Sequence, residues 1–204
     1  MRAALRLSVV LWALMIAGCE NTTAKRQCVF VTVLVSVPLE AGWEMMSDLS
    51  LPHFYVPGIE RTEIVSREMS GSGVHRRVYE SADEYLDETV IEWEEGAGFV
   101  LRLHEGESPL QPFERAEFSY AIREHGEQSS LVELAMLMQM PWGGFGEWLG
   151  SEFILPEVED RLMAVAAGLK FFYETGRSAT SAERDQLLGE VSSVAEDAAC
   201  APFI

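Results

Sequence analysis

The sequence has few basic residues for its length. Its 204 residues include 15 lysines and arginines against 33 aspartates and glutamates, which gives a formal net charge of −18. Nucleic acids and anionic lipid surfaces attract basic patches, so this charge argues against both as partners. The excess of acid instead indicates a solvated surface that keeps the protein in solution.

Metal-binding side chains are also scarce. The four histidines, at positions 53, 75, 104 and 125, are scattered along the chain, and the three cysteines form no CxxC motif. Structural zinc sites need clustered cysteines and histidines at characteristic spacings. We therefore expect no structural metal and no cofactor.

The apolar run at residues 7–17 is too short to span a bilayer comfortably. It follows two basic residues, Arg2 and Arg6, a pattern that is typical of a secretory signal. The run ends in Ile-Ala-Gly-Cys at residues 16–19, which resembles the lipobox of bacterial lipoproteins. The alternatives are a plain secretory signal and a buried helix with a chance cysteine.

The lipobox resemblance implies that the peptidase cuts before Cys19, which then carries the acyl chains. Residues 1–18 would be the signal peptide and residues 19–27 a short polar tether. Several acyl chains anchor a protein firmly in a bilayer. We expect the protein to be lipid-anchored in a bacterial cell envelope, facing the periplasm or the cell exterior.

Two cysteines remain once Cys19 is acylated, Cys28 and Cys200. Outside the cytoplasm they can pair as a disulfide. The alternative is a buried Cys28 and a free Cys200 on a loose tail.

A long amphipathic helix is predicted near the end of the chain. Pro156 suits its first turn, and Gly176 suits its termination. An earlier start would place Pro156 inside the helix and kink it. The apolar stripe, at spacings of three and four, consists of Val158, Leu162, Val165, Leu169, Phe172 and Tyr173. A stripe of this length needs a large apolar partner.

The segments before this helix predict a sheet that supplies that partner. A short helix is expected at residues 39–48, and a loop with two prolines and a glycine at 51–58. Seven strands in antiparallel succession followed by a long helix make an α+β fold. The strands are expected at residues 28–37, 59–69, 74–81, 85–93, 99–104, 113–123 and 129–140.

Alternation along the strands predicts which side chains face the helix. The inner set is Thr89, Ile91, Trp93, Phe99, Leu101, Leu103, Phe118, Tyr120, Ile122, Val132, Leu134, Met136, Met138 and Met140. The same alternation turns Glu88, Glu92, Arg102 and His104 outward, and places Asp87 on the inner side. Asp87 is therefore the ionisable side chain expected nearest the interior, and no catalytic residue is assigned.

The order of these features resembles the SRPBCC superfamily, in its polyketide cyclase/dehydrase and START-like lipid-transport branch. The resemblance rests on Leu-Glu-Ala-Gly-Trp-Glu-Met-Met-Ser-Asp-Leu-Ser at 39–50, Val-Pro-Gly at 56–58, the hairpins and Gly-Leu-Lys-Phe-Phe-Tyr-Glu-Thr-Gly at 168–176. It covers residues 28–177. It implies a helix-grip fold, in which a seven-stranded antiparallel sheet wraps around a C-terminal helix and encloses an apolar cavity.

Residues 178–204 are expected to form an appendage. Thr180 and Glu183 match a capping box, and Leu187, Val191 and Val194 follow at helical spacing. A second short helix is therefore predicted here, followed by a frayed tail.

The predicted ligand-binding residues combine the helix stripe with the inner face. They are Trp93, Leu101, Tyr120, Met136, Met138, Leu169 and Tyr173. Flexible methionines suit a pocket for varied lipids, and plain core packing is the alternative. Aromatic residues on two loops are candidates for the cavity mouth, or for packing against the helix end: Phe54, Tyr55, Trp142, Phe145 and Trp148.

Three functions remain open. The first is a membrane-anchored protein that binds or transfers a lipid or another hydrophobic small molecule. The second is a cyclase or dehydratase that acts on a polyketide-like substrate, which only the resemblance favours. The third is an envelope interaction protein whose own side chains fill the cavity.

Overall fold

The structure is a computed structural model that describes residues 26–196, with side chains as far as Ser193. The predicted signal peptide, Cys19, Cys200 and the last residues of the tail lie outside the described residues. The acylation of Cys19 and the pairing of Cys28 with Cys200 therefore stay predictions.

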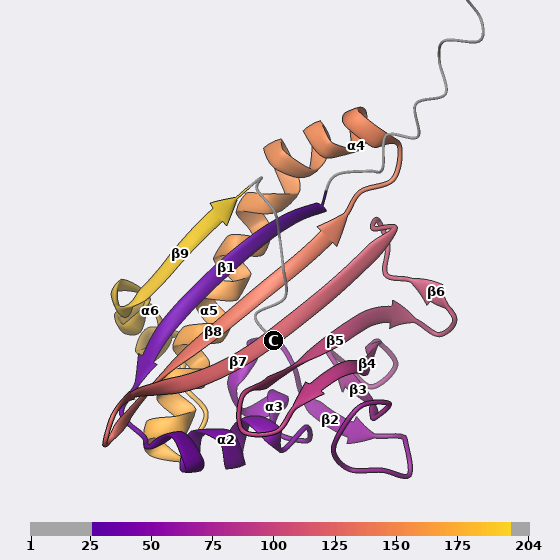
Figure 1. Cartoon of the computed structure of the whole chain (residues 1–204). Coiled ribbons are helices and arrows are strands. Elements are labelled where there is room, and N and C mark those ends of the chain that lie inside the picture. Colours follow the sequence, from indigo (N-terminus) through magenta and orange to yellow (C-terminus); the bar gives the residue numbers. More distant parts are fainter. Residues whose placement is uncertain (1–25, 197–204) are drawn as a thin grey trace, which may run out of the picture.

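The described residues form one antiparallel sheet and a long helix packed on its inner face (Figure 1). The strand order is β2-β3-β4-β5-β7-β8-β1-β9, and β6 pairs with β5 beside this path. The strands are β1 (Arg26–Val35), β2 (Arg61–Ile64), β3 (His75–Tyr79), β4 (Tyr85–Glu94), β5 (Gly98–Glu105), β6 (Ser108–Pro109), β7 (Arg115–Gly126), β8 (Ser129–Gln139) and β9 (Val191–Glu196).

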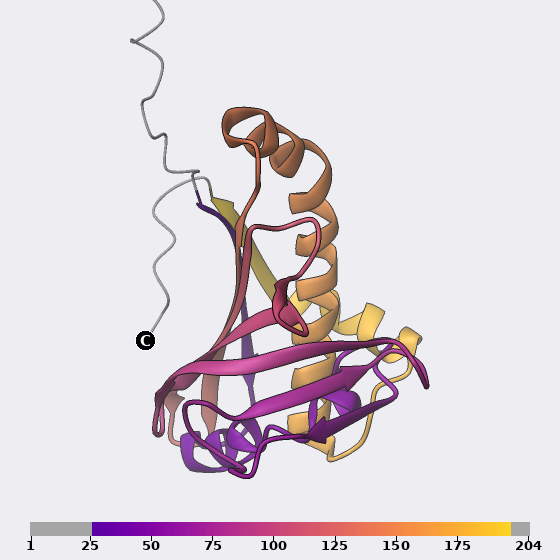
Figure 2. The same ribbon diagram turned by 90° about the vertical axis from the view of Figure 1, so that its right-hand side faces the viewer.

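The sheet bends around the helix, as Figure 2 shows. Strands β1, β7 and β8 run along α5 (Leu155–Thr175), and β2–β5 turn across the C-terminal half of that helix. The predicted α+β helix-grip architecture is confirmed. The sheet has nine strands in the described residues where seven were expected, because β6 and β9 are added to it.

The long helix begins earlier than Pro156. It starts with α4 (Gly143–Leu149), continues through a π-helical turn (Gly150–Ile154) and then becomes α5. A proline inside a helix clashes with the carbonyl four residues earlier and lacks an N–H. The wider π turn directly before Pro156 accommodates this defect. The helix ends as predicted, at Gly176 in the left-handed conformation, with φ +72°.

The inner faces of three strands are confirmed. The core cluster contains the predicted inward residues of the central strands: Phe99, Leu101 and Leu103 of β5, Tyr120 and Ile122 of β7, and Val132, Leu134, Met136 and Met138 of β8. The helix stripe packs onto them through Leu162, Val165, Leu169, Phe172 and Tyr173.

The prediction for β4 is wrong between Glu88 and Ile91. A bulge separates the pairs Val90–Leu101 and Glu92–Val100, so Ile91 is an extra residue that shifts the alternation. On the near side of the bulge Glu88 and Val90 are buried, and Thr89 faces outward, where its hydroxyl contacts His104 at 2.8 Å. Beyond the bulge Trp93 lies opposite Phe99 on the inner side, as expected.

The short elements agree in part. α2 (Leu39–Ser47) lies where it was expected, but the predicted loop at 51–58 contains the helical turn α3 (Pro52–Tyr55). In the C-terminal part, the capping box of Thr180 and Glu183 begins α6 (Ser181–Leu187) as predicted.

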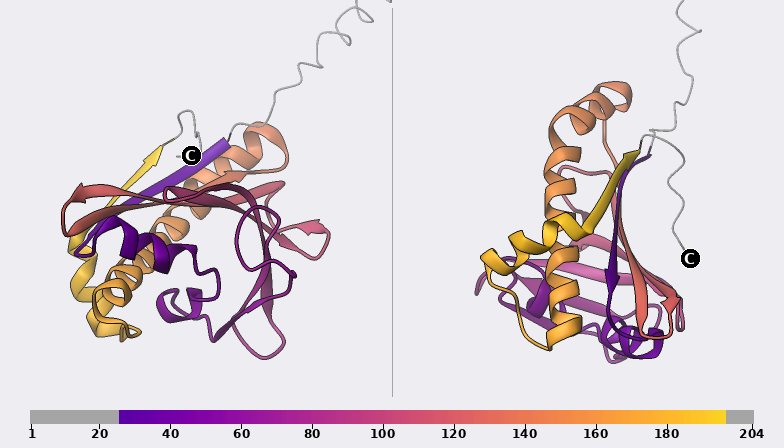
Figure 3. Two further views of the ribbon diagram at one scale, coloured as in Figure 1. Left: turned by 60° about the horizontal axis from the view of Figure 1, so that its bottom comes forward. Right: turned by 90° about the vertical axis from the view of Figure 1, so that its left-hand side faces the viewer.

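The helix predicted to reach Val194 is wrong. After a short turn at Leu188–Glu190, the chain becomes β9 and pairs with β1 from Val33–Val191 to Cys28–Glu196 (Figure 3). The open edge of β1 offers hydrogen bonds that a helix at this position would leave unused.

Candidate functional site

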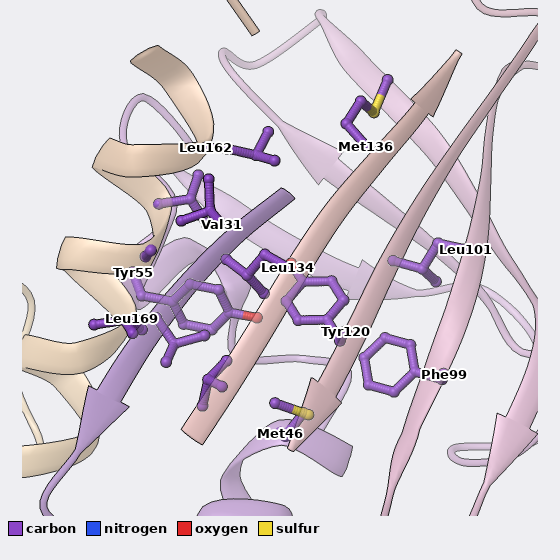
Figure 4. Packing of buried hydrophobic residues seen from close by; sticks show 14 of the residues in the cluster. Val31, Met46, Tyr55, Phe99, Leu101, Tyr120, Leu134, Met136, Leu162 and Leu169 are labelled. Carbon is purple, nitrogen blue, oxygen red and sulfur yellow. The ribbon is translucent and has the colours of Figure 1, made fainter. Parts of the chain in front are cut away.

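The predicted ligand-binding residues come together between the sheet and α5. Leu101, Tyr120, Met136 and Leu169 pack in one cluster, which Figure 4 shows from close by. Met138 and Tyr173 are buried in the same cluster, and Trp93 packs against it half-buried. The structure thus places six of the seven in one core cluster and Trp93 against it.

A buried ion pair at this interior was missed by the sequence reading. Arg76 of β3 is 2% exposed, and its Nε donates a hydrogen bond to Glu88 Oε2 at 2.5 Å. Its Nη1 donates to the Leu49 carbonyl oxygen at 3.0 Å. Alternation in β3 could have found this residue, since it shares one face with the buried Val74 and Val78.

The charge of Arg76 is maintained by its neighbours. Burial by itself disfavours the charged guanidinium, but Glu88, Tyr120 and Tyr55 together outweigh burial and raise the pKa of Arg76 above its ordinary value. Glu88 reaches the interior only because the bulge at Ile91 turns this part of β4 around. Arg76 is therefore a charged group that is shielded from water and fixed in position by its hydrogen bonds.

Tyr55 and Tyr120 lie near this charge, and Tyr173 lies next to them. Burial raises the pKa of Tyr173 and of Tyr55 well above the ordinary value, and the neighbouring Tyr120 raises both further. Burial also raises the pKa of Tyr120 itself, although the nearby Arg76 opposes this effect. All three hydroxyls are protonated at neutral pH, so they are able to donate a hydrogen bond and do not act as bases.

The Tyr173 hydroxyl differs from the others because it is buried without a hydrogen-bond partner among the described residues. Its ring lies edge-on to Tyr55, with ring centroids 6.5 Å apart. A buried polar group without a partner costs free energy, and such a group in a native structure calls for an explanation. The Tyr173 hydroxyl is able to donate a hydrogen bond to an acceptor atom of a bound ligand.

Asp87 does not face this interior, and its predicted inward placement is wrong. Its carboxylate contacts His75 Nε2 at 2.7 Å and accepts hydrogen bonds from Arg77 Nε and the Gly106 N–H, both at 3.0 Å. Burial would raise the pKa of Asp87, but hydrogen bonds from Arg77, Gly106 and His75 lower it overall. Asp87 therefore acts as an ionised anchor on the outer face of the sheet.

A hollow of about 430 Å³ lies where two strands separate. Pairing between β5 and β7 ends at Arg102–Glu117, after which β5 pairs with β6. Leu103 and Ala116 line this hollow and also belong to the core cluster. The hollow thus borders the interior, although none of the seven predicted ligand-binding residues lines it.

The two candidate mouth segments have different environments. Phe54 stacks on Phe172 of α5 at 5.2 Å, so it packs against the helix end, and Tyr55 is buried. Trp142, Phe145 and Trp148 are exposed on and beside α4. Neither segment lines the hollow between β5 and β7.

The described part of the chain has neither a membrane-spanning helix nor a cluster of metal-binding side chains. Within residues 26–196, no helix combines the length and the apolar character needed to cross a membrane. In the same residues, no group of three or more histidine, cysteine, aspartate or glutamate side chains is arranged to hold a metal ion.

This architecture defines the chain as a helix-grip protein, and solved structures share it. No family model matches the sequence, and no curated protein matches it. Major latex-like protein 151 from Panax ginseng has a TM-score of 0.57 at 14% identity, with 72% of this chain and 97% of that chain covered.

Two bacterial structures are similar in the same way. A START superfamily protein from Mycobacterium smegmatis has a TM-score of 0.52 at 19% identity, covering 71% of this chain and 95% of that one. The Zhui aromatase/cyclase from a Streptomyces species has a TM-score of 0.51 at 17% identity, covering 76% and 99%. These likenesses confirm the fold that the SRPBCC resemblance implied.

Proposed function

We propose that this protein binds or transfers a lipid or another hydrophobic small molecule between its sheet and α5, while acylated Cys19 holds it at a membrane of the bacterial envelope. The observation that carries the proposal is the buried Tyr173 hydroxyl, which has no hydrogen-bond partner within residues 26–196. A ligand with a carbonyl or carboxylate group would supply the missing acceptor. Its apolar body would lie among the core side chains.

Some side chains of the interior are able to change conformation around such a ligand. Met136 and Met138 are unbranched and flexible, so they repack around different shapes at little cost. The hollow between β5 and β7 reaches the core at Leu103 and Ala116, which makes it the entrance that we propose. Burial of the ligand would yield about 25 cal/mol per Å² of apolar surface, less the cost of ordering it.

Changing Tyr173 to Phe is expected to weaken binding of a fluorescent fatty acid about tenfold or more, because a hydrogen bond to a charged group contributes about 1.5–3 kcal/mol. Binding of diphenylhexatriene, which has no acceptor, should change little. Stability should not fall, since the change removes an unpartnered buried hydroxyl. Fluorescence titration of both probes against both proteins measures this.

The control is Met136→Trp, which adds bulk to the same interior and should weaken both probes. If the native protein binds neither probe, its own side chains fill the interior, and the envelope interaction protein replaces our proposal. If Tyr173→Phe binds the fatty acid as tightly as the native chain, the Tyr173 hydroxyl does not hold the ligand.

The membrane anchor is tested separately. Changing Cys19 to Ser is expected to abolish incorporation of radiolabelled palmitate and to leave the precursor uncut, because the acyl chains and the peptidase both need this thiol. Cys28→Ser, which keeps the lipobox, is the matched control and should be labelled like the native chain. Equal labelling of the Cys19→Ser and native proteins would refute the anchor.

One observation favours an enzyme as the second candidate. Glu88 is a carboxylate that faces the interior, the position that an acid or base of a cyclase or dehydratase would need. Glu88 already accepts a hydrogen bond from Arg76, however, and the neighbouring Tyr120 is a protonated donor. Binding is therefore the function that we place first.

A further inference from the structure

Four large aromatic side chains are exposed within twelve residues of the chain. They are Trp142 (71% exposed), Phe145 (62%), Trp148 (52%) and Phe153 (65%), which we call the aromatic face. The ring centroids of Phe145 and Trp148 are 5.9 Å apart, and those of Trp148 and Phe153 are 6.0 Å apart. Single exposed apolar residues are ordinary, but a contiguous group marks an interaction surface.

The aromatic face is held outward by packing on the other side of the same helix. The Gln27 amide of β1 donates hydrogen bonds to the Glu147 carbonyl at 2.8 Å and to Ser151 Oγ at 2.7 Å. A Cβ at Gly150 would lie 2.1 Å from Gln27 Oε1, so glycine is needed for this close approach. The α4 region is therefore held against the start of β1, and the four aromatic side chains on its other side stay more than half exposed.

The aromatic face lies at the end of the molecule where β1 begins. Arg26 pairs with Gln139, and α4 begins four residues after Gln139 (Figure 1). Arg26 is seven residues from Cys19, a distance of roughly 25 Å at full extension. An acylated Cys19 would thus keep the aromatic face within reach of a bilayer.

We propose that the aromatic face inserts into the interfacial region of an electrically neutral lipid bilayer. Tryptophan and phenylalanine are favoured at this depth, where rings lie partly in the apolar layer. Residues 141–155 contain two glutamates and no lysine or arginine, so the attraction is apolar and anionic lipid would weaken it. The insertion would fix the orientation of the domain on the membrane, which an acyl tether alone leaves free.

The proposal rests on the proposed anchor only for proximity, and its test is independent of acylation. Full-length protein with Trp12→Phe is mixed with vesicles of phosphatidylcholine brominated on its acyl chains. Bromine quenches the fluorescence of tryptophans that enter the bilayer. Among the described residues the exposed tryptophans are Trp142 and Trp148, since Trp43 is buried and Trp93 is half-buried. We expect quenching, and Trp142→Phe with Trp148→Phe should abolish it.

A second pair of variants separates insertion from mere proximity. Phe145→Ser with Phe153→Ser keeps both reporter tryptophans and should lose most of the quenching. Val65→Ser with Met69→Ser changes two exposed apolar residues between β2 and β3 and should keep it.

Three results would overturn the proposal. The first is that the full-length protein is not quenched. The second is that the protein with Phe145→Ser and Phe153→Ser is quenched as strongly as its parent. The third is that quenching occurs only when phosphatidylglycerol is present. If the parent protein is not quenched and sediments as a dimer, and Phe145→Ser with Phe153→Ser makes it a monomer, the aromatic face binds a second copy of this chain. Palmitate labelling reports on the anchor alone, so the two failures are distinguishable.

Discussion

Replacing Arg76 with methionine is expected to lower the free energy of unfolding by about 3–5 kcal/mol, the usual cost of removing one partner from a buried ion pair. The change leaves the Glu88 carboxylate buried without its partner and removes the hydrogen bond to the Leu49 carbonyl. Denaturant titration followed by circular dichroism measures the loss. The size of the effect comes from the uncompensated charge, since methionine retains most of the apolar volume.

Two controls show whether burial causes the effect. Arg76→Met combined with Glu88→Leu should recover most of the stability, because an apolar pair of similar size often replaces a buried ion pair without loss. Arg61→Met breaks an exposed pair with Glu63 and should lower stability much less, because water screens exposed charges. If Arg76→Met costs no more than Arg61→Met, the interior charge is not shielded from water.

The double variant also bears on function. If the double variant regains stability but loses affinity for the fatty acid, Arg76 and Glu88 contribute to ligand binding. A protein that regains both would show that the pair is structural.

Truncating Leu169 to alanine is expected to destabilise the protein by about 2–5 kcal/mol, as loss of a buried leucine side chain usually does. Leu169 is 0% exposed in the middle of α5 and faces the inner side of the sheet (Figure 4). Thermal and denaturant unfolding of the variant measures the change. The loss combines the lost transfer of apolar atoms from water with the cavity that remains.

Leu34→Ala is the matched control, because Leu34 is the same residue type and is 41% exposed on β1. Its cost should be about 1 kcal/mol or less, as is usual for exposed positions. Equal destabilisation by the two changes would mean that the α5 stripe does not form the core.

Local signals were sufficient for several elements. The three- and four-residue spacing that includes Leu162 and Leu169 predicted the face of α5, since a helix has one period wherever it packs. Gly176 and the capping box of Thr180 and Glu183 were read correctly, because each acts on neighbouring backbone groups. The same holds for Leu101, Tyr120 and Met136, which lie on strands with regular alternation.

The polar part of the candidate site was not read from the sequence. Glu88 was assigned to the outside because the extra residue at Ile91 is invisible until β4 is aligned with β5. The ion pair with Arg76 follows from that alignment, as does the outward placement of Asp87. That the Tyr173 hydroxyl has no hydrogen-bond partner among the described residues also depends on its neighbours in the folded chain.

The sequence by itself determined the class of fold, the helix with its stripe, and most of the apolar inner face, because periodicity and caps are properties of short segments. Only the tertiary structure decided the bulge, the added strands and the buried charge. Val191 continues a helical spacing, yet it lies in β9 because the open edge of β1 offers backbone hydrogen bonds there. Strand pairing joins residues far apart in the chain, so its consequences appear only when the partner strand is in place.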